Sequence, residues 1–157
     1  MKTRIIILTL LLSYQLQAQN NDLSLLTAYL DIKDALISNK ATAASEAAVA
    51  LSTAISKIKT TDDNGAVATA WKQHKNTLLK QAEVIANTKD IEKQRVAFAE
   101  LSLSYWPVVK LSTTGETLYY DYCPMKKSYW ISAEESIKNP YYGAKMLSCG
   151  KVSEKIN

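Results

Sequence analysis

Apolar and polar positions follow two different patterns along the chain. Between residue 22 and about residue 106, apolar side chains recur every three or four positions, which is the spacing of an amphipathic helix. This stretch contains one glycine and no proline, whereas the other three glycines and all three prolines follow it. Seven aromatic residues fall between positions 119 and 142. We therefore expect a helical part followed by a compact, loop-rich C-terminal part.

The apolar spacing of the helical part predicts four helices joined by short connections. They are expected over residues 23–38, 41–59, 66–87 and 89 to about 107. Asp22 is a suitable N-cap for the first helix, and the acidic turn 62–65 suits the start of the third. Pro107 should kink or end the fourth within a turn. The expected fold class is mainly α: an antiparallel four-helix bundle with a small loop-rich C-terminal cap.

The C-terminal cap has signals for strands and turns. Residues 118–122 predict a short strand, alone or paired as a hairpin. Ser132 to Glu135 has the spacing of a capping box, which predicts one short helical turn. Asn139, Pro140 and Gly143 then mark turns. Trp130 and the tyrosine pairs are expected to cover these loops and dock them onto the helices.

The first eighteen residues have the layout of a secretory signal peptide. Lys2 and Arg4 precede an apolar run at 5–12 that is too short to span a bilayer, and the small residue Ala18 suits cleavage after it. An uncleaved N-terminal anchor is the alternative. We expect a signal peptide at 1–18 and one domain at 19–157, with the helices at about 22–112 and the cap at about 113–157. The protein is then periplasmic or secreted, with no membrane insertion after cleavage.

Charge and composition exclude several classes of function. The 157 residues include 19 basic and 15 acidic ones, a formal charge of +4, and the leader carries two of the basic residues. A surplus of about two dispersed charges is too small for a nucleic-acid surface. Two cysteines and one histidine exclude a disulfide-dense scaffold, a four-cysteine zinc site and a multi-histidine centre. No catalytic triad or phosphate-binding loop is recognisable, so we expect no enzymatic activity.

The soft sulfur donors are the most suggestive chemistry in the chain. Cys123 and Met125 flank Pro124, and Met146 lies three residues before Cys149. Thiolate and thioether ligands select Cu(I), and imidazole also suits copper, so His74 is a fifth candidate ligand.

Each of these residues also has a structural interpretation. Cys123 and Cys149 could form a disulfide in an exported protein, closing a loop of about 25 residues worth about 3–4 kcal/mol. Met125 and Met146 could be core filler, and His74 a core histidine. The residues alone leave these alternatives open.

Several of these motifs occur together in one known family. The C-terminal segments that carry the resemblance are 122–125, 130–132, 137–143 and 146–152, with the sequences YCPM, WIS, IKNPYYG and MLSCGKV. The helical segment 94–102, QRVAFAELS, adds to it. Together they resemble the bacterial domain of unknown function 3347, with matching order and spacing over roughly residues 25–153.

The resemblance implies a link to metal handling outside the cytoplasm. Members of the family are exported, and the domain also occurs fused to periplasmic adaptor subunits of heavy-metal efflux pumps, notably copper-type ones. It therefore implies an efflux adaptor or another metal-handling protein as partner. Carried over by position, the candidate copper ligands are Cys123, Met125, Met146 and Cys149.

The remaining motif positions carry over as structural residues. These are Trp130, Asn139, Pro140, Tyr141, Gly143 and Gly150. Many members have histidine where this chain has Tyr122, which removes one imidazole ligand and gives more weight to His74 or to an all-sulfur site. We expect a soft-metal protein, with copper favoured; the alternative is a non-catalytic structural or interaction module with a Cys123–Cys149 disulfide and no metal.

Overall fold

The computed structural model describes residues 23–58, 65–112 and 114–157. The expected signal peptide, the N-cap Asp22 and most of the acidic turn at 62–65 lie outside these residues. None of the helices in the described part combines the length and apolar character needed to cross a bilayer.

Four α-helices occur in the described residues, close to the predicted bounds. The first helix covers residues 23–37, and the others are α2 (Ala41–Lys57), α3 (Ala66–Ala86) and α4 (Ile91–Val109). The Asp90 side chain caps α4 by accepting hydrogen bonds from the backbone amides of Glu92 and Lys93. Pro107 lies in the last turn of α4, which ends two residues later. The four helices and the mainly helical character are confirmed.

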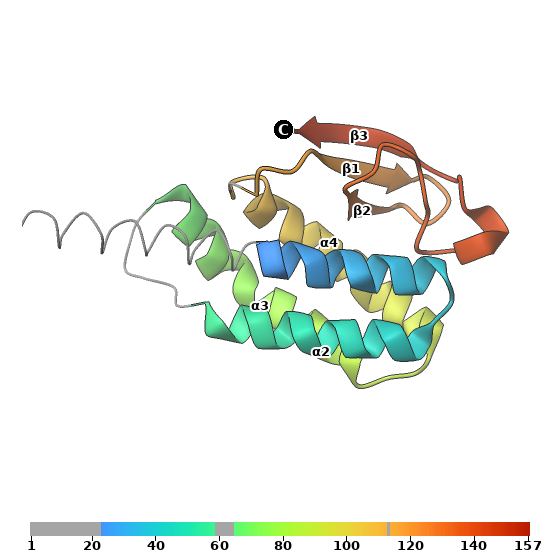
Figure 1. Cartoon of the computed structure of the whole chain (residues 1–157), viewed down its shortest axis with the longest axis horizontal. Coiled ribbons are helices and arrows are strands. Elements are labelled where there is room, and N and C mark those ends of the chain that lie inside the picture. Colours follow the sequence, from blue (N-terminus) through green and yellow to red (C-terminus); the bar gives the residue numbers. More distant parts are fainter. Residues whose placement is uncertain (1–22, 59–64, 113) are drawn as a thin grey trace, which may run out of the picture.

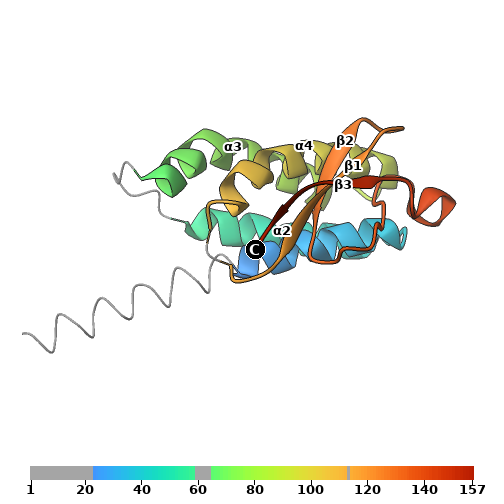
Figure 2. The ribbon, with the colours of Figure 1, turned by 90° about the horizontal axis from the view of Figure 1, so that it is seen from above.

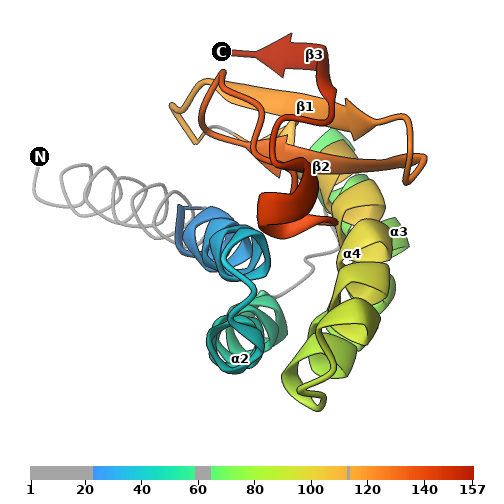
Figure 3. The ribbon, with the colours of Figure 1, turned by 90° about the vertical axis from the view of Figure 1, so that its right-hand side faces the viewer.

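The helices form a layer on which a small sheet rests (Figures 1 and 3). The first helix lies beside α2, while α3 packs against both α2 and α4. The buried residues form one continuous core that joins these helices to the sheet. The alanines Ala44 and Ala48 of α2 are fully buried in this core.

The C-terminal part contains a three-stranded antiparallel sheet. Its strands are β1 (Leu118–Cys123), β2 (Ser128–Ser132) and β3 (Lys151–Ile156), in the order β2-β1-β3. β1 and β2 form the hairpin that was predicted as one option. β3 was not predicted, because its residues are mostly polar and exposed and carry no apolar alternation. Viewed from above, the strands cross obliquely over the helices (Figure 2).

The predicted helical turn at Ser132–Glu135 is wrong. Ser132 is the last residue of β2, the residues after it form bends, and the only short helix in this part of the described chain is the 3-10 helix η1 (Gly143–Met146). The Ser132 hydroxyl accepts a hydrogen bond from the Glu134 amide at 3.1 Å and donates one to the Glu134 carbonyl at 3.0 Å. The side chain thus satisfies the backbone locally, which competes with helix formation.

Aromatic side chains fasten the sheet to the helices. The Tyr29 hydroxyl of the first helix lies 2.6 Å from the Ser102 hydroxyl of α4 and accepts a hydrogen bond from the Ile131 amide of β2 at 3.0 Å. On α4, the Trp106 ring stacks on Tyr120 of β1 with centroids 4.5 Å apart. The position of β1, and therefore of Cys123 at its end, is fixed by the helices beneath it.

Candidate functional site

The two cysteines meet where β1 ends. Cys123 is fully buried at the last position of β1, and Cys149 is half-buried just before β3. Both are free thiols, and their sulfurs lie 3.8 Å apart. The structure therefore brings together the two cysteines that the sequence singled out.

Two backbone amides of the β1–β2 turn, those of Met125 and Lys126, interact with this pair of sulfurs. The Lys126 amide donates a hydrogen bond to Cys123 Sγ at 3.4 Å. Burial raises the pKa of the Cys149 thiol, as do its hydrogen bond to Cys123 and the charge of Cys123, while the backbone amide of Met125 acts in the opposite direction. The net effect favours the neutral thiol of Cys149 over the thiolate, which is the form that binds metals.

The side chains of the other three predicted ligands, Met125, Met146 and His74, are not fixed beside the two cysteine sulfurs by any hydrogen bond among the described residues. The Met125 and Met146 side chains are 65% and 36% exposed, so the interpretation of either as core filler is wrong. His74 lies half-buried on α3, whose main neighbours are α2 and α4. Across the described ranges, no group of three or more His, Cys, Asp and Glu side chains is arranged to hold a metal ion. A metal held here would have the two cysteine sulfurs as its anchored ligands.

The segment that carries Cys149 is built by Asn139. Its amide side chain donates to the Cys149 carbonyl at 2.6 Å and accepts from the Tyr141 amide at 2.8 Å. The Asn139 backbone amide also donates to the Leu147 carbonyl at 2.7 Å. One buried side chain thus closes the loop between its two ends.

Trp130 and Gly150 pack against each other behind the thiol pair. Trp130 is fully buried, and a Cβ atom on Gly150 would lie 2.7 Å from its ring. The Tyr141 ring meets Trp130 edge-on at 6.0 Å, and the Tyr141 hydroxyl donates to the Tyr129 carbonyl. Only glycine fits at position 150, so the residue after Cys149 is fixed by packing.

A buried aspartate beside this site was missed by the sequence reasoning. Asp121 is opposite Trp130 in the β1–β2 register and is fully buried. Neither oxygen of its carboxylate, nor the indole nitrogen of Trp130, has a hydrogen-bond partner among the described residues. Burial raises the pKa of Asp121 to about 7, against the opposing effect of Lys33. An acidic residue inside the apolar run of β1 was the signal available in the sequence.

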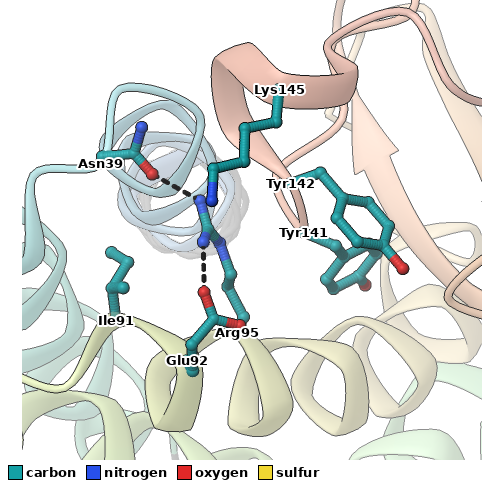
Figure 4. A pocket seen from close by; sticks show the side chains of 7 residues that line it. All are labelled: Asn39, Ile91, Glu92, Arg95, Tyr141, Tyr142 and Lys145. Atoms are coloured by element: carbon teal, nitrogen blue, oxygen red, sulfur yellow. Dashed lines mark hydrogen bonds and ion pairs between the residues drawn. The ribbon is translucent and has the colours of Figure 1, made fainter.

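Arg95 of α4 was also missed, and it anchors the other end of the cap (Figure 4). Its guanidinium donates to the carbonyls of Pro140 at 2.9 Å and Leu36 at 3.2 Å, to Asn39 Oδ1 at 2.7 Å and to Glu92 Oε1 at 2.6 Å. Although Arg95 is only 5% exposed, its charge is paired and hydrogen-bonded. The signal was a cationic residue at a buried position of the α4 pattern.

Gly143 makes room for this arginine. Its φ of +54° lies in the left-handed region, and a Cβ atom there would lie 3.0 Å from Asn39 Oδ1 and 3.1 Å from Arg95 Nη2. Pro140 is buried beside it and accepts a hydrogen bond from Arg95 Nε through its carbonyl. The turn signals Pro140 and Gly143 therefore mark the point where the cap meets the helices.

Comparison with known proteins identifies a family but not an activity. A family model described as "Protein of unknown function (DUF3347)" matches residues 25–117. This range exceeds half of the chain, and the protein belongs to that family. The matched range covers the helical part and ends just before β1, so the thiol pair and the C-terminal motif segments lie outside it. No curated protein and no solved structure matches the chain.

Proposed function

We propose that this member of the DUF3347 family is an exported metal-handling protein that binds a soft metal ion, with copper favoured, between Cys123 and Cys149. The observation that carries the proposal is the 3.8 Å distance between the two free sulfurs. Two sulfurs bound to one ion at about 2.3 Å and at the tetrahedral angle lie about 3.8 Å apart. The pair thus has the spacing of two ligands of one ion before any ion is bound.

The surroundings of the pair support a soft ion as cargo. Thiolate and thioether sulfurs are the ligands that select Cu(I), and both cysteines are free thiols. The exposed thioethers of Met125 and Met146 come from the same two segments and can approach an ion from solvent. Two anchored ligands with open positions suit delivery of the ion to a partner, such as a periplasmic efflux adaptor, rather than permanent storage or catalysis.

The same distance between the two sulfurs also favours a second candidate function, that of a structural module stabilised by a disulfide. Two sulfurs this close need only a small movement to form a disulfide, which would staple the loop to β1 without a metal. The protein would then be a structural or interaction module. In either case we infer that the four helices form an antiparallel bundle that serves as the platform for the cap.

Native mass spectrometry of the reduced protein with Cu(I) tests the metal proposal. We expect one bound copper ion in the protein and none in the Cys123→Ser/Cys149→Ser variant. The Met125→Leu/Met146→Leu variant should weaken but keep binding, and His74→Gln should bind as the parent does. Absence of a sulfur-dependent copper adduct under reducing conditions refutes the proposal.

A thiol count separates the two candidates. The protein is purified without reductant and titrated with a thiol reagent, and its melting is recorded with and without copper. Two free thiols and a melting temperature raised by copper favour the metal protein. No free thiol, together with melting that copper leaves unchanged, favours the disulfide staple.

A further inference from the structure

A pocket lies beside Arg95, where the cap meets the helices (Figure 4). It has a volume of about 460 Å³ and is lined by Asn39, Ile91, Glu92, Arg95, Tyr141, Tyr142 and Lys145. These residues come from the turn after the first helix, from the first half of α4 and from the loop that contains η1. This volume is within the range of small-molecule sites, which is about 300–1,000 Å³.

The cation on the pocket wall is fixed before any ligand arrives. Arg95 is held by four hydrogen bonds to protein oxygens. A guanidinium has five N–H groups, so one N–H of Nη1 has no hydrogen-bond partner among the described residues. Because the guanidinium is immobilised already, binding a ligand costs little further ordering of this side chain.

A second cation lies at the rim. Lys145 is exposed, and its side chain makes no ion pair with any described residue. Figure 4 shows it extending from η1 toward the guanidinium of Arg95. Glu92 contributes one negative charge, so the charged groups of the lining sum to a single positive charge. That balance suits a monoanion.

The remaining lining is apolar or aromatic. Tyr142 and Ile91 are half-buried on opposite sides of the charged groups and present carbon surface to the pocket. We propose that this pocket binds a small monocarboxylate with an apolar body. The carboxylate lies between Lys145 and the free Arg95 N–H, and the apolar body lies against Tyr142 and Ile91. The proposal is independent of the thiol pair, since the pocket lining contains neither cysteine.

Calorimetric titration with 3-phenylpropionate tests this proposal. We expect saturable 1:1 binding with a Kd below about 10 mM, while 3-phenylpropylamine and inorganic phosphate do not saturate in the same range. Lys145→Gln should weaken binding about tenfold, because a charge-assisted hydrogen bond is lost. Lys145→Arg, which keeps the charge, should stay within about twofold of the parent.

Two control variants make the result specific. Lys72→Gln removes an exposed lysine from α3, away from the pocket, and should bind as the parent does. The Cys123→Ser/Cys149→Ser variant should also bind normally, which separates this test from that of the metal proposal. Lack of saturable binding by 3-phenylpropionate overturns the inference. It is also overturned if the amine or phosphate binds as well as the carboxylate, or if folded Lys145→Gln binds with unchanged affinity.

Discussion

Two buried ionisable residues, Arg95 of α4 and Asp121 of β1, differ in whether their side chains have hydrogen-bond partners. Arg95, where the loop meets the helices, has hydrogen bonds to four oxygens from the first helix, its following turn, α4 and the loop. The carboxylate of Asp121, on the strand that ends in Cys123, has no hydrogen-bond partner among the described residues. A satisfied charge holds a structure together, whereas an unsatisfied one costs free energy. The cap is thus anchored at its loop end, and its destabilising polar groups gather near the thiol pair.

Among the substitutions that test this difference, loss of Arg95 should lower the stability of the protein most. Arg95→Leu leaves the buried carbonyls of Leu36 and Pro140 and the exposed Asn39 side chain without their donor and separates the loop from the first helix, so we expect the free energy of unfolding to fall by about 3–5 kcal/mol. Urea denaturation measures it. Lys93→Leu, at an exposed position of the same helix, is the control and should change stability by less than about 1 kcal/mol. Similar losses in the two variants would show that Arg95 does not anchor the cap.

Substitutions at Gly143 and Gly115, which both have a left-handed backbone, test how closely Gly143 packs against Arg95. Gly143→Ala combines backbone strain with close contacts to Asn39 and Arg95, so we expect a loss of about 2–3 kcal/mol. Gly115→Ala has a φ of +72° but nothing within 4 Å of the added Cβ, so only the strain remains, about 1 kcal/mol. Thermal denaturation of both variants measures the difference. Equal losses of stability in the two variants would show that the contacts of Gly143 with Asn39 and Arg95 do not matter.

Asp121 should make the reduced, metal-free protein less stable as pH rises. Its folded pKa of about 7 lies above the ordinary value of 3.8, so the folded state holds the extra proton between these values. The free energy of unfolding therefore falls as pH rises from about 4 through 7. Asp121→Asn cannot ionise, so we expect it to be about 1–2 kcal/mol more stable than the parent at pH 8 and similar at pH 4.

Urea denaturation at pH 4, 6 and 8 gives both stability curves. Asp31→Asn, which removes an exposed carboxylate from the first helix, controls for the loss of charge alone. If the Asp121→Asn curve runs parallel to the parent curve over this range, burial of Asp121 does not produce the pH dependence.

The last expected effect concerns the Tyr29 hydroxyl, which joins the helices to the sheet. Tyr29→Phe removes the acceptor of the Ile131 amide and the partner of Ser102, which should cost about 1–2 kcal/mol. Tyr122→Phe removes a hydroxyl from a half-buried ring of β1 and should be nearly neutral. Equilibrium denaturation distinguishes the two. A neutral Tyr29→Phe would mean that ring packing alone holds the sheet on the helices.

The helices were predictable because their evidence is local. Three- and four-residue apolar spacing predicted all four within two residues, and the sulfur motifs predicted that Cys123 and Cys149 would meet. β3 was not predictable, since its pairing with β1 depends on distant backbone rather than on its own apolar pattern. Arg95 and Asp121 were missed for a related reason. A charged residue is assigned to the surface from sequence, and only the structure shows that these two are buried. His74 has the right chemistry, but sequence spacing could not show which helices surround it.

The anchoring arginine also has a consequence for the order of folding. Its carbonyl partners Leu36 and Pro140 lie 59 and 45 positions away, in opposite directions along the chain. Contacts of such long range close large loops and form slowly. Until all three segments meet, removing the guanidinium from water brings no compensating bonds. We therefore expect the loop to lock onto the helices late, after α3 and α4 have paired, and φ-values near zero at Arg95 and Gly143 would be its kinetic signature.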